Sequence, residues 1–303
     1  MLLDAEGAAW RNAQAWTDAG LTEVARRPAM DWTVVVPFFN EESGLAETLE
    51  SLASQTVRFR LVLVDNGSID DSARIARAAC ERLGLDHVLV HQGMPGKVHA
   101  LRMGLDYVHT RYVATCDADT WYPPRYLAEA QALLERPGCV VAGAYFIAPG
   151  DGEDERRRES ANIRIAARLL PRQCHAGGAG QAFRTEALKA AGGFDPRHWN
   201  YVLEDHEVIH RVMRHGTMRY DDGLWCVPSD RERDRESIRW TLTERMLYSI
   251  TAPFAGEWFF YDFLARRLRA RHLTTERMRE RAYQTLAGQT LAGVVGEPAY
   301  SLR

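Results

Sequence analysis

Short apolar segments alternate with segments of helical periodicity through the first half of the chain. The apolar segments cover residues 33–36, 59–64, 88–90, 112–116 and 140–146. Continuous apolar runs are typical of strands buried on both faces, and such strands belong to parallel sheets that helices cover on either side. The alternation therefore predicts a doubly wound α/β domain built on a mostly parallel sheet.

The composition is that of a globular protein with a large core. Of the 303 residues, 46% are hydrophobic and 26% are charged, and the net charge of -3 argues against nucleic acid as the main partner. The five cysteines are scattered without Cys-x-x-Cys spacing, which indicates reduced thiols rather than a disulfide framework or a zinc site. The sequence has neither a signal-like N-terminus nor a stretch of about 18 apolar residues, so we expect a cytoplasmic protein.

Polar residues follow each of the first four apolar segments. They are Pro37, Asn40 and Glu41 after the first segment, Asp65 after the second, Lys97 after the third, and Asp117 and Asp119 after the fourth. The carboxyl ends of parallel strands share one edge of the sheet, and open α/β sheets place their ligands there. Each segment also has a simpler interpretation: a hairpin turn at residues 65–67, a helix start with a solvated lysine at 96–97, and a solvated loop at 117–119.

Two of these groups favour a charged ligand. Asp117 and Asp119 stand one residue apart at a strand end, where they can hold a hard divalent cation while one of them accepts a hydrogen bond from a hydroxyl. Lys97 and Lys189 are the only lysines among 38 basic residues, so a lysine at position 97 indicates a role that arginine does not fill.

Motifs along residues 32–240 resemble those of an inverting glycosyltransferase of the GT-A fold, in the large group called family 2. The motifs are Val-Val-Pro-Phe-Phe-Asn-Glu at 35–41, Val-Asp-Asn-Gly-Ser at 64–68, Gly-Lys at 96–97, Asp-Ala-Asp at 117–119, Gly-Gln-Ala-Phe-Arg at 180–184, Gly-Gly-Phe-Asp at 192–195 and Glu-Asp at 204–205. The resemblance implies a GT-A domain at residues 31–230, with a nucleotide-sugar half at 31–120 and an acceptor half at 121–230. We expect a helical appendage at 1–30 and a helical, arginine-rich extension at 231–303.

The resemblance assigns the strand-end residues to a nucleotide diphosphate sugar, with UDP as the expected nucleotide. Pro37, Asn40 and Glu41 would line the nucleoside pocket, Asp65 would bind the base, and Asp117 would lie at the ribose. Asp119 would bind Mg²⁺ or Mn²⁺ across the two phosphates, since a cation there stabilises the charge that develops on the leaving diphosphate. Lys97 would add to the positive field around the donor.

Glu204 and Asp205 stand at the start of a predicted helix over residues 204–215. The helix macrodipole favours a carboxylate at this end and should keep it ionised near neutral pH. The resemblance makes Asp205 the general base that takes the proton from an acceptor hydroxyl, with Glu204 beside it toward the acceptor or the diphosphate. The alternative is that Asp205 only caps the helix.

Arg239 and Trp240 resemble the end of a Gln-x-x-Arg-Trp element found in relatives that act on glycan or lipid acceptors, although Glu236 replaces the glutamine. The resemblance would place Trp240 on the acceptor and Arg239 near the diphosphate. The alternative is that both residues lie on a plain helix surface, and the substitution at position 236 leaves the type of acceptor open.

Two further segments carry expectations about the surface. Residues 149–159 are charged and contain Gly and Pro, which predicts a surface loop. Residues 254–271 join an aromatic cluster to a run of arginines, a pattern that favours peripheral contact with an anionic membrane, at its inner face, where a lipid-linked acceptor would be presented. Packing against the α/β domain as a closing helix or dimer contact is the alternative, and the oligomeric state stays open.

The expected activity is metal-dependent transfer of a sugar, with inversion, to a hydroxyl of a glycan, lipid or small molecule. Asp117-Ala118-Asp119-Thr120 also matches the Asp-x-Asp-x-Thr loop of haloacid dehalogenase-like phosphotransferases, but that loop normally follows the first strand and here three strands precede it. A non-catalytic relative that binds nucleotide or serves as a scaffold is the other alternative.

Overall fold

The structure is a computed structural model that describes residues 30–175, 177–229 and 240–277. The appendage expected for residues 1–30 lies outside the described residues except for Met30, and Arg239 lies outside them as well. The limits expected for the domains stay predictions.

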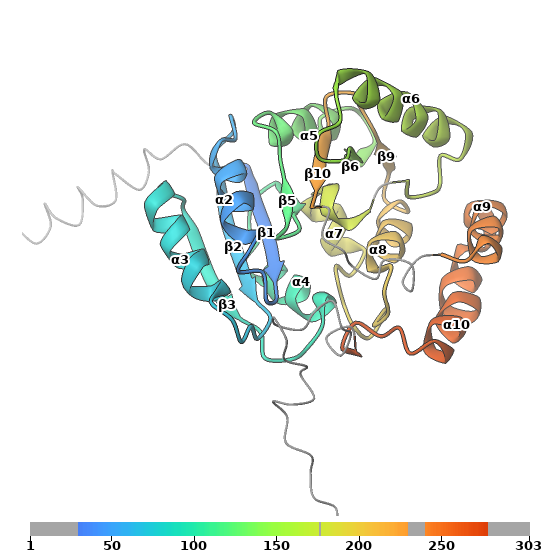
Figure 1. The fold of residues 1–303 in the computed structure, drawn as a ribbon. Coiled ribbons are helices and arrows are strands. Elements are labelled where there is room, and N and C mark those ends of the chain that lie inside the picture. The colour runs from blue at the N-terminus through green and yellow to red at the C-terminus, as the bar shows by residue number, and fades with distance from the viewer. Residues whose placement is uncertain (1–29, 176, 230–239, 278–303) are drawn as a thin grey trace, which may run out of the picture.

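Seven strands form the main sheet in the order β3-β2-β1-β4-β8-β6-β9 (Figure 1). They are β1 (Trp32–Phe38), β2 (Phe59–Asp65), β3 (His87–His91), β4 (Tyr112–Thr115), β6 (Cys139–Gly143), β8 (Gln181–Arg184) and β9 (Thr217–Arg219). Only β8 runs antiparallel to its neighbours in this sheet, β4 and β6, whereas the other neighbouring pairs are parallel. The prediction of a mostly parallel sheet is therefore confirmed.

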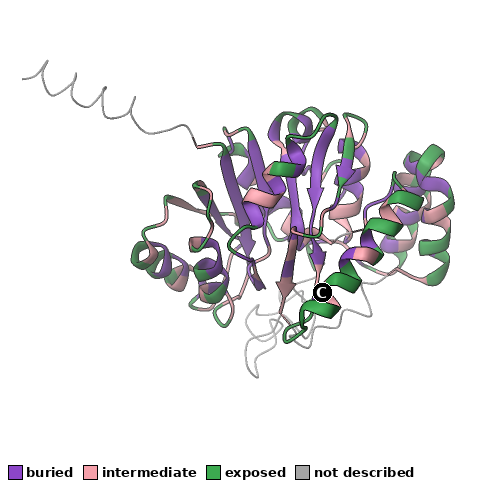
Figure 2. Ribbon diagram, turned by 90° about the horizontal axis from the view of Figure 1, so that it is seen from above, coloured by how far each residue is buried: buried purple, intermediate pink, exposed green. Residues whose placement is uncertain are grey.

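Helices cover both faces of this sheet, and successive side chains of a buried strand pack on opposite faces, as the pleat requires. Val34 and Val36 on β1 pack into one hydrophobic cluster, while Val35 between them packs into the other. The first cluster includes residues of α2 (Leu45–Ala53), α3 (Ser72–Leu83) and α5 (Tyr126–Leu134), and the second includes residues of α4 (Lys97–Asp106), α7 (Thr185–Ala190) and α8 (Glu204–Val212). Figure 2 shows the buried strands between helices whose outer faces are exposed.

The strand order also determines where a ligand can bind. The chain proceeds from β1 outward through β2 and β3, and then crosses to the other side of β1 for β4. At such a reversal the connections leave adjacent strands in opposite directions, which opens a crevice at the strand carboxyl ends. The segments after β1 and β4, which carry Asn40 and the Asp117–Asp119 turn, leave the sheet at this same edge, because the two strands are parallel neighbours.

Two local expectations were wrong. Residues 140–146 form two strands instead of one, because β7 (Tyr145–Phe146) leaves the main sheet and pairs with β10 (Trp225–Pro228), which also pairs with β5 (Thr120–Trp121). Most of the loop expected at 149–159 belongs to α6 (Glu153–Leu169). The charged residues of that segment support the helix through pairs one turn apart, such as Arg157–Glu153 at 2.6 Å.

The C-terminal part is helical, as expected. It comprises α9 (Leu242–Glu257), the π-helix η3 (Trp258–Leu264) and α10 (Ala265–Ala270). A capping box between Thr241 and Glu244 begins α9, and this part packs on Trp199 and Val202 as a third hydrophobic cluster. No helix within the described ranges is both long enough and apolar enough to span a membrane.

The aromatic segment divides between core and surface. Phe259, Phe260 and Leu264 are fully buried, so packing against the domain explains the centre of the cluster. Phe254 and Trp258 remain exposed. The expected contact of residues 254–271 with a membrane therefore cannot involve the whole segment.

Candidate active site

The loops after β1 and β2 are hydrogen-bonded into one unit. Asn40 adopts a left-handed φ of 52°, its side-chain oxygen accepts a hydrogen bond from the Ile69 N–H at 2.9 Å, and its own N–H donates to the Ser68 hydroxyl at 3.1 Å. Asp65, which is 8% exposed, accepts a hydrogen bond from the Ser68 N–H at 2.8 Å. Pro37 is buried in β1 and Glu41 follows Asn40, so the residues expected at the nucleoside lie on this unit.

Asn66 holds the next loop in place. Its side-chain nitrogen donates to the carbonyls of Gln92 at 3.0 Å and Met94 at 2.7 Å, and its side-chain oxygen accepts from the Gly96 N–H at 2.9 Å. These bonds set the start of α4, whose first residue is Lys97. A buried asparagine at the end of β2 thus positions the lysine at the end of the following loop.

Lys97 lies among three carboxylates from two other parts of the chain. Its Nζ is 2.6 Å from Asp117 Oδ1 after β4 and 3.6 Å from Glu204 Oε1 at the start of α8. Asp205 is nearby, because a Cβ built on Gly178 would lie 3.5 Å from Lys97 Nζ and 3.6 Å from Asp205 Oδ2. We call Lys97, Asp117, Glu204 and Asp205 the charge cluster.

The surroundings shift the pKa values of Glu204 and Asp205 in opposite directions. Burial alone would lower the pKa of Lys97, but Asp117 and Glu204 outweigh burial and raise it, so the ammonium is retained. Burial raises the pKa of Glu204 against the opposing effect of Lys97. Burial also opposes ionisation of Asp205, yet His206 and then Lys97 lower its pKa, which keeps this carboxylate anionic.

Local backbone geometry directs Asp205 into the cluster. Leu203 is the N-cap of α8 and adopts a left-handed conformation with φ 65°, which is unusual for a residue other than glycine. Asp205 is the second residue of the helix rather than its N-cap, and its interpretations as a base and as a cap both stay predictions. Its Oδ1 accepts a hydrogen bond from the His206 N–H at 2.8 Å and lies 2.8 Å from His206 Nδ1.

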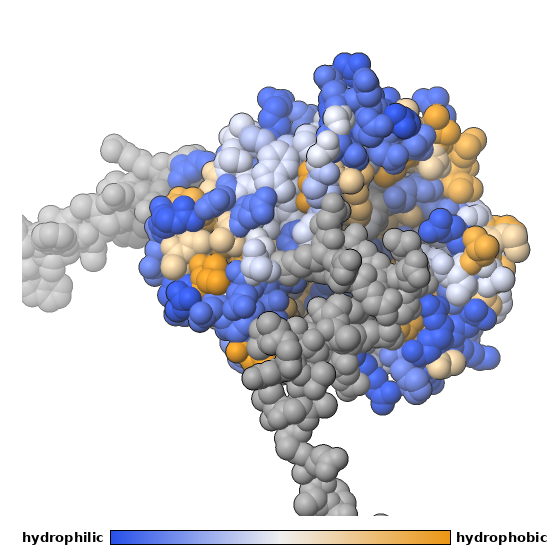
Figure 3. All heavy atoms as spheres, viewed as in Figure 1, coloured by the Kyte–Doolittle hydropathy of each residue, from blue (hydrophilic) through white to orange (hydrophobic). Residues whose placement is uncertain are grey.

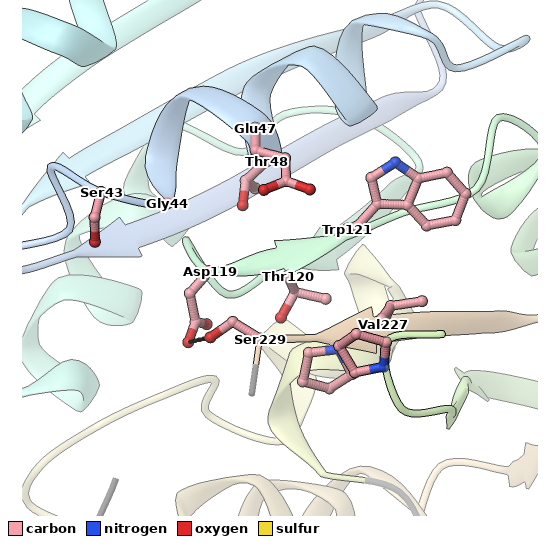
Figure 4. Close-up of a pocket in the computed structure, with 11 residues that line it drawn as sticks. Ser43, Gly44, Glu47, Thr48, Asp119, Thr120, Trp121, Val227 and Ser229 are labelled. Atoms are coloured by element: carbon pink, nitrogen blue, oxygen red, sulfur yellow. Dashed lines mark hydrogen bonds between the residues drawn. The ribbon is translucent and has the colours of Figure 1, made fainter. Parts of the chain in front are cut away.

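Asp119 faces a separate cavity of about 520 Å³. Its side chain accepts a hydrogen bond from the Ser229 hydroxyl at 3.0 Å, and its carbonyl accepts one from the Ser229 N–H at 2.9 Å. Figure 4 shows Asp119 and Ser229 side by side, with Glu47 and Thr48 of α2 on the opposite side of the cavity. The residue is 8% exposed, so its carboxylate is held in a defined position at the wall.

This arrangement fits a cation that shares its ligands with a substrate. Within the described parts of the chain, no group of three or more His, Cys, Asp or Glu side chains could enclose a metal ion. Mg²⁺ in phosphate-handling sites is usually held by one or two carboxylates together with waters and substrate phosphates. One positioned carboxylate beside a cavity is consistent with that form of binding.

A family model described as "Glycosyl transferase family 2" matches residues 33–192, more than half of the 303-residue chain. The chain belongs to glycosyl transferase family 2. The matched segment includes the loops after β1 and β2 and the Asp117–Asp119 turn. Membership excludes the haloacid dehalogenase-like alternative, in which the Asp-x-Asp-x-Thr loop would follow the first strand.

The curated family 2 relatives match shorter segments. An undecaprenyl-phosphate 4-deoxy-4-formamido-L-arabinose transferase of Pseudomonas paraeruginosa is 36% identical over 145 residues, which are 46% of this chain and 40% of that protein. A dodecaprenyl-phosphate galacturonate synthase of Rhizobium johnstonii is 34% identical over 113 residues, which are 36% of this chain and 33% of that protein. The matches thus span well under half of these relatives.

Solved structures match the fold of this chain over a longer part of its length than the curated relatives match its sequence. A mannosyltransferase of Pyrobaculum calidifontis, in complex with GDP-Man and Mn²⁺, has a TM-score of 0.59 at 21% identity and matches 87% of this chain and 85% of that one. TarS of S. aureus, in complex with UDP-GlcNAc, has a TM-score of 0.54 at 19% identity and matches 79% of this chain and 73% of that one. The GT-A fold expected from the sequence is confirmed.

Trp240 lies beside the charge cluster, in contact with the ring of His206. Its ring centroid is 5.2 Å from that of His206, and the ring stacks on Tyr248 at 5.0 Å and Phe259 at 5.7 Å. Trp240 is therefore not on a plain helix surface. Its predicted contact with an acceptor stays a prediction, as does the role of Arg239.

Three residues of the site have no signal in the sequence that marks them. Tyr122 donates a hydrogen bond to the Ala179 carbonyl at 2.7 Å and accepts one from the Asp117 N–H at 2.9 Å, which joins the Asp117 turn to the glycine-rich segment after α6. Ser229 supports Asp119, and His206 supports Asp205. Ser229 lies 110 positions from its partner, so only the folded chain brings the two together.

Proposed function

We propose that this family 2 chain is a metal-dependent inverting glycosyltransferase that transfers a sugar from a nucleotide diphosphate sugar to an acceptor hydroxyl. The observation that carries the proposal is the charge cluster, which brings Lys97, Asp117, Glu204 and Asp205 together at the strand reversal. Asp119 follows two residues after Asp117 and faces its own cavity. The cluster and the cavity lie where an open α/β sheet binds its ligand.

We assign the donor to the unit formed by the loops after β1 and β2 together with the Asp117–Asp119 turn. Asp65 would bind the base, and Asp119 would hold Mg²⁺ or Mn²⁺. A bound cation supplies stabilisation for the charge that develops on the leaving diphosphate. The Mn²⁺ in the structure of the mannosyltransferase with GDP-Man supports this use of a metal. UDP is the nucleotide that we expect first, with GDP and dTDP as alternatives.

We assign the general base to Asp205. Its lowered pKa keeps the carboxylate ionised at neutral pH, so it can take the proton as the acceptor oxygen attacks the anomeric carbon. Attack on the face opposite the leaving diphosphate gives inversion in a single displacement. Lys97 screens the base from the neighbouring carboxylates, and Trp240 supplies an aromatic face beside it.

The electrostatics of the cluster favour a hydroxyl acceptor over a phosphate. Three carboxylates surround one ammonium, so an incoming phosphate dianion meets net negative charge. A phosphate is also largely ionised at neutral pH, with a second pKa of about 6, and needs no base. The relatives named for undecaprenyl or dodecaprenyl phosphate indicate a lipid-linked context, and we therefore propose a hydroxyl on a lipid-linked glycan as the acceptor.

We further propose that residues 31–230 form the transferase domain, that residues 231–303 form an extension on its acceptor side, and that the enzyme works at the inner face of the membrane. Trp240 supports this arrangement, since it packs both on the aromatic residues of the extension and on His206 beside the base.

Nucleotide release from a panel of UDP-, GDP- and dTDP-sugars, with Mn²⁺ and a lipid-glycan extract as the acceptor, tests the proposal. Asp154→Asn is a matched control, because Asp154 lies on α6, outside the charge cluster and the donor loops, is 88% exposed and faces Arg157 at 3.9 Å. We expect release from one donor that requires acceptor and is retained in the control. Tight nucleotide binding without release from any donor would favour the non-catalytic alternative.

A further inference from the structure

A row of large apolar side chains lies exposed along α9 and the start of η3. The row consists of Leu242, Met246, Ile250, Phe254 and Trp258, which are 86%, 63%, 57%, 78% and 45% exposed. Each member follows the previous one by four positions, so consecutive members are neighbours on the helix surface. We call these five residues the α9 row.

The α9 row is separate from the face of α9 that packs on the domain. Tyr248 and Ala252 on the other side of the helix are buried in the third hydrophobic cluster. Single exposed apolar residues are ordinary on soluble proteins, but a continuous row of five is typical of a surface that another body covers. Figure 3 shows apolar surface over α9 and, above it, near the end of α6, where Ile165 and Leu169 are 58% and 72% exposed.

Basic side chains surround the row. Arg245 is exposed beside Met246, and Arg266 is 80% exposed as the second residue of α10. Arg172, from the segment after α6, donates a hydrogen bond to the Pro253 carbonyl at 3.3 Å, which brings a third exposed arginine to the middle of the row. This charge complements an anionic surface.

The acidic side chains at the same end are already matched by arginines. Glu257 pairs with Arg214, and Asp262 faces Arg266 at 3.8 Å. A hollow of about 500 Å³ opens there, lined by Trp258, Asp262, Phe263, Arg266 and Arg267. Arg266 faces Asp262 across this hollow and Arg267 binds the buried Glu244, so it is the aromatic rings of the hollow that suit the headgroup level, at the end of the apolar row.

We propose that the α9 row docks on an anionic lipid bilayer, with α9 lying in the plane of the interface. Leu242, Met246, Ile250 and Phe254 enter the boundary between headgroups and acyl chains, and Trp258 marks the headgroup level. This surface differs from the one expected from residues 254–271, because Phe259, Phe260 and Leu264 in the centre of that segment are buried and the row extends back to residue 242. Arg267 and Arg271 form ion pairs with the buried Glu244 and so stabilise the fold instead of belonging to the docking surface.

Docking places the active site at the lipid surface. Trp240 precedes the N-cap of α9 by one residue and contacts the His206 ring. A lipid-linked acceptor held in the bilayer would reach the charge cluster by passing along this aromatic edge. This consequence rests on the proposed function, whereas the docking itself does not.

Co-sedimentation with vesicles tests the docking. Vesicles of phosphatidylcholine alone and of phosphatidylcholine with phosphatidylglycerol are compared at low and at moderate salt. We expect binding to the anionic vesicles that weakens with salt. Met246→Ser with Ile250→Ser and Phe254→Ser should lower partitioning by more than 100-fold, since burial of each such side chain contributes about 1.5–3 kcal/mol.

Matched variants separate the row from general surface effects. Ile69→Ser with Met94→Ser removes comparable exposed apolar surface elsewhere, where the side chains are 50% and 56% exposed, and should leave vesicle binding unchanged. Arg245→Gln with Arg266→Gln should weaken binding by roughly 10–30-fold and reduce its salt dependence, at about 1 kcal/mol per arginine.

Three results would overturn the docking proposal. Wild-type protein that stays in the supernatant with anionic vesicles at both salts contradicts it, and so does full binding by the triple serine variant. A concentration-dependent dimer that the same variant abolishes would show that a second copy covers the row. UDP binding by the triple variant and vesicle binding by Asp119→Asn report on the transferase and the docking surface independently.

Discussion

Removal of the ammonium from the charge cluster should destabilise the protein in a pH-dependent way. In Lys97→Met the carboxylates of Asp117 and Glu204 lose the cation at 2.6 Å and 3.6 Å, and Asp205 loses one of the two partners that keep it ionised. Three partly buried carboxylates then face one another. Methionine retains most of the volume of the lysine chain, so the effect of the charge dominates.

The size of the effect follows from burial. Loss of one partner from a fully buried ion pair costs about 3–5 kcal/mol, and because the Lys97 side chain is 35% exposed we expect about 1–3 kcal/mol. At about 2–4 °C per kcal/mol for a chain of this size, the melting temperature should fall by roughly 3–10 °C.

The pH dependence has a definite sign. Without Lys97 the folded-state pKa of Glu204, already raised by burial, rises further above its unfolded value. A raised carboxylate pKa means that the folded state binds protons more readily, so the variant regains stability as pH falls toward that pKa. The difference between wild type and Lys97→Met should therefore be larger at pH 8 than at pH 5.5.

Urea unfolding at both pH values measures this difference. Lys189→Met is the matched control, because Lys189 donates a hydrogen bond to the Val108 carbonyl at 2.6 Å and no carboxylate is among its described ion pairs. Lys97→Arg retains the charge, so it should restore most of the stability, while activity should fall because the planar guanidinium is larger and less compact than the ammonium. A loss in Lys97→Met that is the same at both pH values, or that Lys189→Met reproduces, would refute the reasoning.

The remaining predictions concern the base, its partner and the core. Asp205→Asn should lower kcat by roughly 10²–10⁴-fold with donor affinity near normal, and a collapse of donor affinity with turnover intact would move Asp205 to the donor site. His206→Phe should shift the acid limb of the kcat profile to higher pH, because the pKa of Asp205 loses the partner that offsets burial; an unchanged limb would assign His206 a packing role. Gly104→Ala should cost about 1–3 kcal/mol in urea unfolding, since its Cβ would overlap Val35, and an unaltered midpoint would show that α4 and β1 separate easily.

The strand-end part of the site could be predicted because a parallel sheet brings successive strand ends to one edge. Asn40 and Asp117 follow β1 and β4, and Asp65 ends β2. These three strands are adjacent in the sheet, so the strand-end residues lie close together in space. Lys97 reaches the same place through the loop that Asn66 holds. Apolar runs and polar residues after them were enough for this inference.

The residues that hold Asp119 and Asp205 in position could not be predicted, because only tertiary contacts bring them to the site. Ser229 meets Asp119 only after β10 has paired with β5, and both strands are too short to be recognised from their sequence. His206 contacts Asp205 at the start of α8, where the chain enters the helix through Leu203 with a positive φ. A leucine in a sequence gives no indication of a positive φ, because this conformation is rare for residues other than glycine.

The sequence also could not predict which aromatic side chains of the C-terminal segment are exposed. Phe254 and Phe260 belong to the same aromatic segment, but one is 78% exposed and the other is fully buried. The kink at Ala255, two residues after Pro253, and the change to a π-helix at Trp258 rotate the segment and decide which rings face the core. A periodicity count that assumes a regular helix cannot make that distinction.

Metal-dependent nucleotide release is the most direct test of the central claim, that Asp119 and Asp205 serve transfer from a nucleotide sugar. The rate of release from the preferred donor, with acceptor present, is compared in Mn²⁺ and in excess EDTA for wild type and Asp119→Asn. The account predicts acceptor-dependent release by wild type in Mn²⁺, little release in EDTA, and little from Asp119→Asn under either condition. Full release in EDTA, or a wild-type rate in Asp119→Asn, would contradict it.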